Sequence, residues 1–422
     1  MPPTALPPSD GLDEVTPPTV VRLPLLPMPP LTVDRQPAPV PAVTPATLAA
    51  PPPAALGAVA PDTPVQAETA VLVSPQAIAV PAEALHGHAM ARELTLLTGG
   101  TGFVGSSVAR ALIAEGHTLR LLVRPGSDRR NIQDLPAQIV EGDLTDPGSL
   151  TAAVAGCRYL LHVAADYRLW VPRPEPMLAV NVDGTRALFQ AAQAAGVERM
   201  VYCSSVAALG LVGDGTPGTE ETPVHPDHIT GTYKQSKYQA EQVVRALARD
   251  GVPVVIVNPS APVGPRDIKP TPTGRMILDA AAGRMPAYVE TGLNIVHVDD
   301  VARGHLLALE RGRVGEAYIL GGEDLGMAHL LALIDDVMGR FGVQRRRLST
   351  RLLQPVAIGA ELSARVFGTE PRVTREMLAM ADKQMFFSSA KAMRELGYTH
   401  RPARQAVADA VAWFRDAGML RG

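Results

Sequence analysis

A strand, a glycine-rich turn and a helix follow one another between residues 93 and 112, and this order constrains the fold more than any other feature. The stretch opens with an apolar run, and four glycines then fall within eight residues before a helical pattern begins. Gly99 and Gly102 leave room for a pyrophosphate against the main chain, and Gly105 lets the helix approach the strand. The helix N-terminus attracts negative charge. An ordinary tight turn is the alternative, and the order of strand, turn and helix favours the dinucleotide. We therefore predict a dinucleotide-binding turn contacted through Thr98, Gly99, Gly102, Phe103, Val104 and Gly105.

Apolar runs and helical patterns alternate after this turn. The runs that predict further strands are 117–123, 137–140, 159–163, 200–203 and 252–257, and helical spacing covers 180–195. Such alternation is typical of an α/β fold with a doubly wound parallel sheet, whose ligand lies at the carboxyl ends of the strands. We predict this Rossmann architecture for residues 92–258. A smaller, mostly helical substrate lobe, with returning core strands and helices, is predicted for 259–422.

The end of the second predicted strand indicates which dinucleotide fits. The residue there faces the adenosine ribose, where an acid accepts hydrogen bonds from a 2′-hydroxyl and a cation meets a 2′-phosphate. Arg124 holds this place, Arg129 and Arg130 follow it, and no acid occurs before Asp128. The arginines favour NADP over NAD as the cofactor, with a solvated loop as the alternative explanation.

Two more strand ends supply candidate cofactor contacts. Asp143 and Leu144 follow the third predicted strand, where an aspartate can accept a hydrogen bond from the adenine amino group. Ala164 follows the fourth strand, and its small side chain leaves room beside the nicotinamide ribose. We expect all three residues to contact the cofactor.

A serine, a tyrosine and a lysine form the candidate catalytic group. Ser205 ends the fifth strand, and the next predicted helix begins near residue 232 with Tyr233 and Lys237 four residues apart on one face. A free tyrosine has a pKa of about 10, and a nearby cation favours its phenolate form. Ser205 would hold the reacting oxygen while Tyr233 moves the proton during hydride transfer. A surface tyrosine beside a solvated lysine is the alternative, which the preceding glycine turn disfavours.

Composition excludes several classes of protein. The 422 residues carry a formal charge of −3 and are 46% hydrophobic, so nothing indicates a nucleic-acid partner. Cys157 and Cys203 are too few for a disulfide framework. His162, His297 and His305 lack metal-ligand spacing, so we predict no metal site. Because no run resembles a membrane span or a signal peptide, we expect a cytoplasmic protein.

The first part of the chain is predicted to form no core. Residues 1–89 are rich in proline and alanine and hold more than half of the 40 prolines, with no aromatic residue and no lysine. Such a segment buries too little apolar surface to fold, so we predict a disordered tail over 1–91. A proline-rich docking arm is one alternative. Another is that translation starts at Met90 and the tail is not made.

These features together resemble an extended short-chain dehydrogenase/reductase of the NAD-dependent epimerase/dehydratase family. The matching motifs run in family order and are Thr98-Gly99-x-x-Gly102-x-x-Gly105, Asp143-Leu144, Asn181-Val182-Asp183-Gly184-Thr185, Ser204-Ser205, Tyr233-x-x-x-Lys237 and His297-Val298-Asp299-Asp300. By that similarity, Ser205, Tyr233 and Lys237 take the catalytic roles, and Tyr233 and Lys237 also contact the cofactor. Asn181 resembles the asparagine that supports the proton relay.

Within this family, the segments 258–274 and 292–312 look most like hopanoid-associated sugar epimerases, which are relatives of the dihydroflavonol reductases. The similarity implies hydride transfer at a secondary alcohol or ketone of a sugar-like or polyol substrate in hopanoid side-chain synthesis. A dihydroflavonol-reductase-like NADPH ketone reductase is the alternative. The family also leads us to expect a homodimer packed through the helices near Ala187 and Gln239.

Three reactions can be weighed from the residues. Sugar dehydratases of this family carry an acidic pair just after the catalytic serine, where this chain has 206–208, Val-Ala-Ala. Nucleotide-sugar epimerases often hold the diphosphate with an arginine where this chain has Leu293 and Asn294. Both departures favour a net dehydrogenase or reductase. A dinucleotide-binding sensor without catalysis is disfavoured because Tyr233 and Lys237 are both present.

The substrate side is less constrained by the sequence. Asn258 and Pro259 begin a segment rich in proline, glycine and threonine that we expect to cross the mouth of the site, and we predict that both contact the substrate, as does Ser205. Further on, an apolar helical pattern predicts a core helix, with a lid or a membrane-contacting helix as alternatives. Its apolar residues are Leu352, Val356, Ile358, Leu362, Val366 and Phe367.

Overall fold

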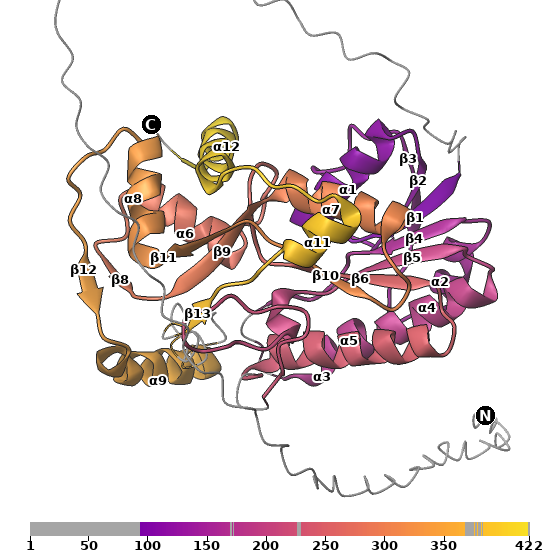
Figure 1. Cartoon of the computed structure of the whole chain (residues 1–422), viewed down its shortest axis with the longest axis horizontal. Helices are drawn as coiled ribbons and strands as arrows, with labels where there is room; N and C mark the ends of the chain where they lie inside the picture. The colour runs from indigo at the N-terminus through magenta and orange to yellow at the C-terminus, as the bar shows by residue number, and fades with distance from the viewer. Residues whose placement is uncertain are drawn as a thin grey trace, which may run out of the picture. The chain divides into compact units, whose positions relative to one another are not determined.

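The computed structural model describes residues 93–420 apart from 169, 170, 172, 226–228, 368–374, 376, 377, 379, 380 and 382. The predicted tail over 1–91 therefore lies outside the described residues. Within them, a parallel sheet with helices on both faces adjoins a smaller region of mixed structure (Figure 1).

Seven strands form one parallel sheet in the order β10-β6-β5-β4-β1-β2-β3. They are β1 (Leu94–Thr98), β2 (Thr118–Val123), β3 (Ala137–Glu141), β4 (Tyr159–His162), β5 (Arg199–Cys203), β6 (Val254–Pro259) and β10 (Ala317–Leu320). The strand order reverses beside β1, which is the switch point where doubly wound sheets bind ligands. The predicted Rossmann fold class is confirmed.

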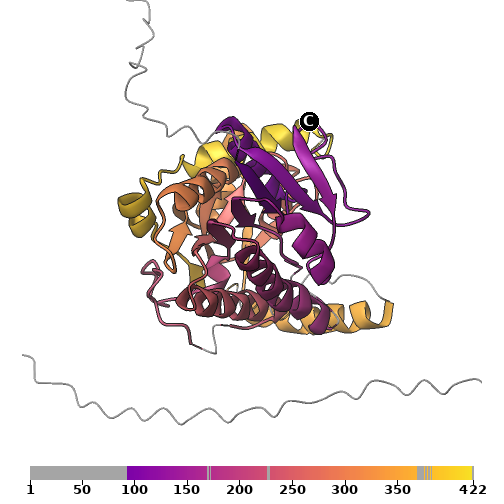
Figure 2. The same cartoon turned by 90° about the vertical axis from the view of Figure 1, so that its right-hand side faces the viewer.

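Helices cover both faces of this sheet, and Figure 2 shows that half of the molecule from its side. One layer holds α1 (Phe103–Ala114), α7 (Val298–Arg311) and α11 (Ala390–Leu396), and the other holds α2 (Pro147–Val154), α4 (Thr185–Ala194) and α5 (Thr232–Arg249). Successive residues Leu96 and Leu97 are fully buried in opposite layers, which explains why the strands are apolar throughout. Short segments between them are α3 (Glu175–Leu178), the π-helical η1 (Ala179–Gly184) and the 3₁₀ turn η2 (Val206–Ala208).

The smaller region contains sheets as well as helices, whereas the sequence predicted a mostly helical lobe. Strands β7 (Ala261–Val263), β9 (Gly292–His297), β11 (Glu323–Gly326) and β13 (Gln384–Met385) form one sheet, and β8 (Ala287–Val289) pairs with β12 (Arg346–Leu348). The helices are α6 (Pro272–Ala281), α8 (Met327–Val337), α9 (Thr350–Phe367) and α12 (Ala403–Asp416). Ile277, Leu330 and Phe414 are fully buried among α6, α8 and α12, so this region has its own core.

The apolar side chains of α9 contradict the sequence prediction. We expected them to form core, but Leu352, Val356, Ile358 and Leu362 are all exposed. The side chains of Val366 and Phe367 lie outside the description. Helical spacing predicted the helix correctly, but it could not indicate which face of the helix turns toward the protein.

Candidate active site

The glycine turn has the close packing that a phosphate-binding turn requires. Gly99 has φ of +76°, and a Cβ atom there would lie 2.6 Å from the Ala164 nitrogen. A Cβ atom on Gly105 would lie 2.0 Å from the Gly99 oxygen, so α1 rests directly on the turn. Gly102 precedes buried Phe103 and caps α1 without a side-chain hydrogen bond. This cradle at a helix N-terminus fits the pyrophosphate of a dinucleotide.

A buried histidine ties the first strand to the neighbouring elements. Thr98 Oγ1 lies 2.7 Å from His162 Nδ1 and accepts a hydrogen bond from the Ala164 nitrogen at 3.2 Å. His162 Nε2 lies 2.9 Å from Thr185 Oγ1, at the start of α4. Burial lowers the pKa of His162 to about 3, so the ring is neutral and serves as a bridge between the two hydroxyls. Thr98 and Ala164 thus lie against the glycine turn, where both were predicted to contact the cofactor.

Arg124 differs from the two arginines that follow it. Arg129 pairs with Glu141, and Arg130 pairs with Asp128 at 2.7 Å. Arg124 is exposed and has no ion-pair partner among residues that the structure describes. Asp128, the first acid after Arg124, is bound by Arg130, which lowers the Asp128 pKa to about 2. Of the three cations, Arg124 remains available to an anionic ligand at the end of β2.

The carboxyl end of β3 carries Asp143 and Leu144, two of the other residues predicted to contact the cofactor. Asp143 Oδ1 accepts hydrogen bonds from the Thr145 nitrogen at 2.8 Å and from its hydroxyl at 2.6 Å, and these bonds lower the Asp143 pKa. Leu144 is buried under Gly184, where a Cβ atom would lie 2.8 Å from the Leu144 Cβ. Val104 is half-buried in the first turn of α1. Asp143 is therefore a fixed, ionised acceptor beside the sheet edge.

The structure brings Ser205 and Tyr233 together. Ser205 follows β5 and caps η2, where its hydroxyl accepts a hydrogen bond from the Ala207 nitrogen at 3.1 Å. Tyr233 lies in the first turn of α5, and its phenol neighbours the Ser205 side chain, whose hydroxyl acts to lower the phenol pKa. The predicted pair thus meets at the carboxyl end of the sheet, on the same edge as the glycine turn.

Lys237 lies one turn further along α5 and is buried. Its Nζ donates a hydrogen bond to the Cys203 oxygen at 3.0 Å and lies 5.5 Å from the centre of the Tyr202 ring. Burial lowers the pKa of Lys237 and raises that of Tyr233 to about 12. We expected Lys237 to lower the Tyr233 pKa. In the chain alone, however, the desolvation of the phenol outweighs the other contributions to this pKa. Tyr233 is therefore protonated at neutral pH.

Asn181 occupies a π-helical turn that the sequence did not predict. Its Nδ2 donates to the Ser236 hydroxyl at 2.9 Å and to the Asp166 oxygen at 2.8 Å, while its Oδ1 accepts from the Asp166 nitrogen at 2.7 Å. Ser236 Oγ in turn donates to the Tyr233 main-chain oxygen at 2.8 Å. The extra residue of the π turn aims Asn181 at the first turn of α5, and such turns are frequent at functional sites.

Glu241 was missed by the sequence analysis. This buried carboxylate accepts hydrogen bonds from Ser204 Oγ at 2.6 Å, Asn258 Nδ2 at 2.8 Å and Arg245 Nε at 2.9 Å. It therefore joins the ends of β5 and β6 to α5. The sequence signal that could have identified Glu241 is its position four residues after Lys237, which places both side chains on one face of the helix.

Asn258 and Pro259, which were predicted with Ser205 to contact the substrate, are both buried. Asn258 is fully buried, and its Nδ2 also donates to the Ser205 main-chain oxygen at 3.1 Å. Pro259 ends β6 within the main sheet. Asn258 holds the backbone of Ser205 in place, and direct contact of either residue with substrate stays a prediction.

An arginine in an unusual backbone conformation links the loop after β7 to the glycine turn. Arg266 has φ of +76°, pairs with Asp299 and donates to Ser107 Oγ in α1 at 3.1 Å. Asn131 Nδ2 bridges the main-chain oxygens of Arg266 at 3.1 Å and Thr101 at 3.2 Å. The loop is therefore fastened to the cofactor half of the site, and the Arg266 charge is already paired.

The histidines considered for metal binding have other contacts. His297 Nδ1 accepts from the Asp299 nitrogen at 3.0 Å and so caps α7. His305 Nδ1 lies 2.8 Å from the Val301 oxygen. Among the residues described here, no group of three or more histidine, cysteine, aspartate or glutamate side chains is arranged to hold a metal ion.

A doubly wound sheet with this glycine cradle defines a Rossmann-fold dinucleotide-binding protein. Residues 95–321 match the model of the NAD dependent epimerase/dehydratase family, which is more than half of the chain. The chain belongs to this family, which makes it an NAD(P)-dependent enzyme of the epimerase/reductase kind.

Known relatives cover the described part of the chain. The crystal structure of gox2253 is 60% identical, spans 78% of this chain and 100% of its own, and has a TM-score of 0.71. A Synechocystis sp. protein named "Putative dihydroflavonol 4-reductase" is 43% identical over 343 residues, 80% of this chain and 99% of its own. Sterol demethylase protein B of Methylococcus capsulatus is 37% identical over 330 residues, 77% of this chain and 99% of its own.

Proposed function

We propose that the chain is an NADP(H)-dependent reductase that interconverts a ketone and a secondary alcohol. The observation that carries this proposal is that Ser205 and Tyr233 are neighbours, placed with Lys237 on the sheet edge that also holds the glycine turn. Bound there, the nicotinamide supplies or accepts the hydride.

Tyr233 in its protonated form can serve as the proton donor of a ketone reduction. With a pKa raised to about 12, the phenol is a proton donor at neutral pH. In ketone reduction, Ser205 holds the substrate oxygen by a hydrogen bond, and Tyr233 donates a proton to it as it becomes an alkoxide. Lys237 carries its charge beside the strand end and orients this corner of the site through the Cys203 oxygen.

The proposed preference for NADP rests on Arg124, the exposed cation at the end of β2. We expect NADPH to be turned over in preference to NADH, and Arg124→Ser to weaken NADPH use at least about tenfold, the equivalent of one hydrogen bond to a charged group. The matched control is Arg130→Ser, because that arginine is already paired with Asp128. Equal use of both cofactors by the unaltered protein would refute the preference.

The substrate is proposed to be a ketone or alcohol without a nucleotide. Where an epimerase of nucleotide sugars often has its diphosphate-binding arginine, Asn294 is buried and donates to Asp324 at 2.7 Å and to the Phe387 oxygen at 3.1 Å. The names of the two relatives, a dihydroflavonol reductase and a sterol demethylase protein, are consistent with non-nucleotide substrates. The absence of acids after Ser205 argues against dehydration.

The narrower form of this proposal names a sugar-like or polyol substrate and a place in hopanoid side-chain synthesis. Both rest on sequence resemblance. Lipid analysis of a strain lacking the gene tests the pathway, since unchanged hopanoid side chains would rule it out.

The homodimer is tested by sedimentation of the purified protein, and a cytoplasmic location is tested by fractionation of cells.

The second candidate function is epimerisation, supported by the family to which the chain belongs. In that reaction the nicotinamide would take the hydride from an alcohol and return it to the other face of the ketone, while Ser205 and Tyr233 hold the oxygen and move its proton, so the cofactor is unchanged overall. The deciding experiment incubates the purified protein with NADPH and a panel of ketones, and with NADP and the matching alcohols. A net change in nicotinamide absorbance supports the reductase. An isomeric product without that change supports the epimerase.

A further inference from the structure

Helix α9 exposes its large apolar side chains to solvent. The exposed fractions are 74% for Leu352, 55% for Val356, 52% for Ile358 and 62% for Leu362. At 100° per residue, these four positions lie within one arc of the helix, so they form a single apolar stripe and not scattered surface residues. A contiguous stripe of this kind marks a surface that contacts something apolar.

The opposite side of α9 carries the small residues that face the protein. Thr350, Ala357 and Ala364 are buried at 8%, 0% and 1% exposure and follow one another at intervals of seven residues. A helix that serves only the core has its large apolar residues on the inward face. Here the arrangement is reversed, because alanines pack inward and leucines point outward.

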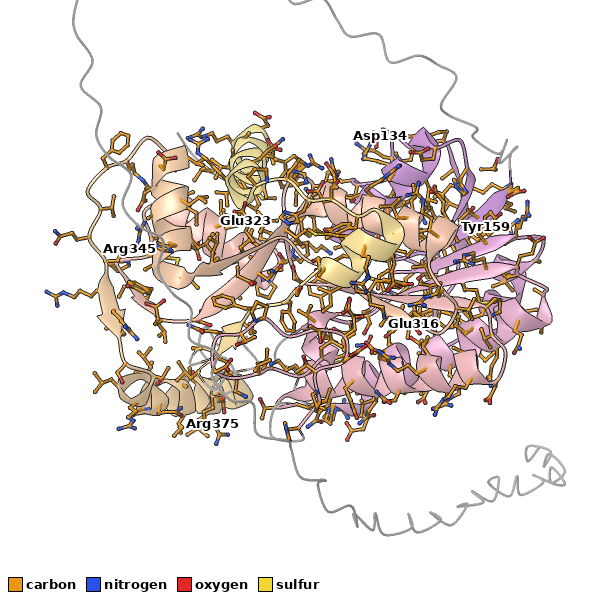
Figure 3. The ribbon with its side chains drawn as sticks, in the orientation of Figure 1. Asp134, Tyr159, Glu316, Glu323, Arg345 and Arg375 are labelled. Carbon is orange, nitrogen blue, oxygen red and sulfur yellow. The ribbon has the colours of Figure 1, made fainter. Side chains whose placement is uncertain are left out.

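Charges around the stripe indicate what covers it. Arg351 lies within the arc of the stripe, and Arg346 on β12 leads into the helix; both are exposed and have no ion-pair partner among the described residues. Glu361, the acid of α9, lies on the inward side and pairs with Arg375 at 3.0 Å, labelled beside α9 in Figure 3. Arg345 does not add to this charge, because it turns to Asp335 between β12 and α8 (Figure 3).

We propose that α9 is a docking surface for an anionic lipid bilayer, with its apolar stripe inserted among acyl chains and Arg346 and Arg351 at the phosphate groups. An apolar stripe with flanking cations and an inward-facing acid matches the chemistry of a helix that lies in a bilayer interface. A second copy of this chain docked through the same face is a poorer match, because it would bring the unpaired arginines of two chains together.

Attachment at α9 is peripheral. No described helix is long and apolar enough to cross a bilayer. α9 lies on the smaller region, at the side of the molecule away from β1, β2 and β3 (Figure 1). Docking through it leaves the cofactor half free of the membrane and brings the substrate region to a surface where apolar ketones are dissolved.

The test is flotation of the full chain with vesicles of phosphatidylcholine alone or of equal parts phosphatidylcholine and phosphatidylserine. We expect binding to the anionic vesicles only, a loss of about fivefold in partition for each of Arg346→Gln and Arg351→Gln, and no binding for the double variant Leu352→Ser, Leu362→Ser. The matched control is Phe341→Ser, which removes an apolar side chain exposed at 84% outside α9 and leaves binding unchanged.

Two outcomes would overturn the proposal. One is that the unaltered chain stays with neither kind of vesicle. The other is that it sediments as an oligomer which the double variant converts to a monomer, since the stripe would then be an interface between copies. Melting temperature and NADPH binding of the double variant, measured in parallel, verify that a loss of flotation does not come from unfolding.

Discussion

The surroundings of the Ser205–Tyr233 pair and the surface of α9 depart from the usual distribution of side chains in opposite ways. Next to the pair, Lys237, Glu241 and Asn258 are charged or polar and yet buried, whereas α9 leaves leucine, valine and isoleucine exposed. Lys237, Glu241 and the amide nitrogen of Asn258 have partners within the chain that offset the cost of removing them from water, whereas Asn258 Oδ1 has none among the described residues. The exposed groups of α9 have no such compensation. The first departure therefore stabilises and orders a site, and the second indicates a contact that the chain cannot make by itself.

The largest expected effect is at Glu241. Glu241→Ala removes the acceptor of Ser204, Asn258 and Arg245 together and leaves buried donors unpaired. We expect the free energy of unfolding to fall by about 3 kcal/mol, measured by urea denaturation. Turnover should fall as well, because the strand ends that carry Ser205 lose their link to α5.

The control for this substitution is Glu198→Ala, which breaks the exposed ion pair with Arg158 and should cost less than about 1 kcal/mol. Similar losses for Glu198→Ala and Glu241→Ala would contradict the idea that burial makes the Glu241 contacts important.

A smaller effect is expected at His162 and depends on pH. Its pKa is about 3 in the folded protein and 6.5 in the unfolded chain, so only the unfolded chain gains a proton as the pH falls below 6.5. The stability from this depressed pKa is present above pH 6.5 and is lost as the pH falls toward 3. Between pH 7 and pH 5, His162 should lower the free energy of unfolding by about 2 kcal/mol.

Urea denaturation of the unaltered protein and of His162→Gln at both pH values isolates this contribution, since the other histidines are common to both proteins. The variant should lose about 2 kcal/mol less than the unaltered protein over this interval. His329→Gln, at an exposed position of α8, is the control and should follow the unaltered protein. The same pH dependence in the unaltered protein and His162→Gln would show that the buried ring does not set it.

The smallest effect is expected on α9. Leu362→Ser replaces a side chain that is 62% exposed, so the free energy of unfolding should change by no more than about 0.5 kcal/mol in the absence of lipid. A loss of 2 kcal/mol or more would mean that Leu362 packs against the protein in solution, and the contrast between the two regions would then disappear.

The sequence predicted the main sheet well because each of its strands is an apolar run followed by a turn. Strands at 118–123, 137–141 and 199–203 lie within a residue or two of their predicted bounds. The pairing of Ser205 with Tyr233 also followed from strand ends that share one edge of a parallel sheet. That inference needed only the order of elements and the spacing of four between Tyr233 and Lys237.

Other features depend on contacts between distant residues and could not be predicted in the same way. β9 pairs with β7, β11 and β13, whose residues lie far apart in the chain, so the sequence predicted returning strands in a mostly helical lobe without indicating this second sheet. The π turn at Asn181 could not be predicted either, because its residues keep the periodic pattern of an ordinary helix. The role of Glu241 depends on three partners from different elements. The rise of the tyrosine pKa in the chain alone depends on burial, whereas the predicted fall relied on the charges of Lys237 and of an oxidised nicotinamide.

The central claim is that Tyr233 donates the proton in a reduction by NADPH. The most direct measurement compares the unaltered protein with Tyr233→Phe, using NADPH oxidation for turnover and NADPH fluorescence for binding. We predict that kcat falls roughly 100- to 10,000-fold while the NADPH dissociation constant stays within about threefold. Undiminished turnover in Tyr233→Phe would contradict the claim and remove the phenol from the mechanism.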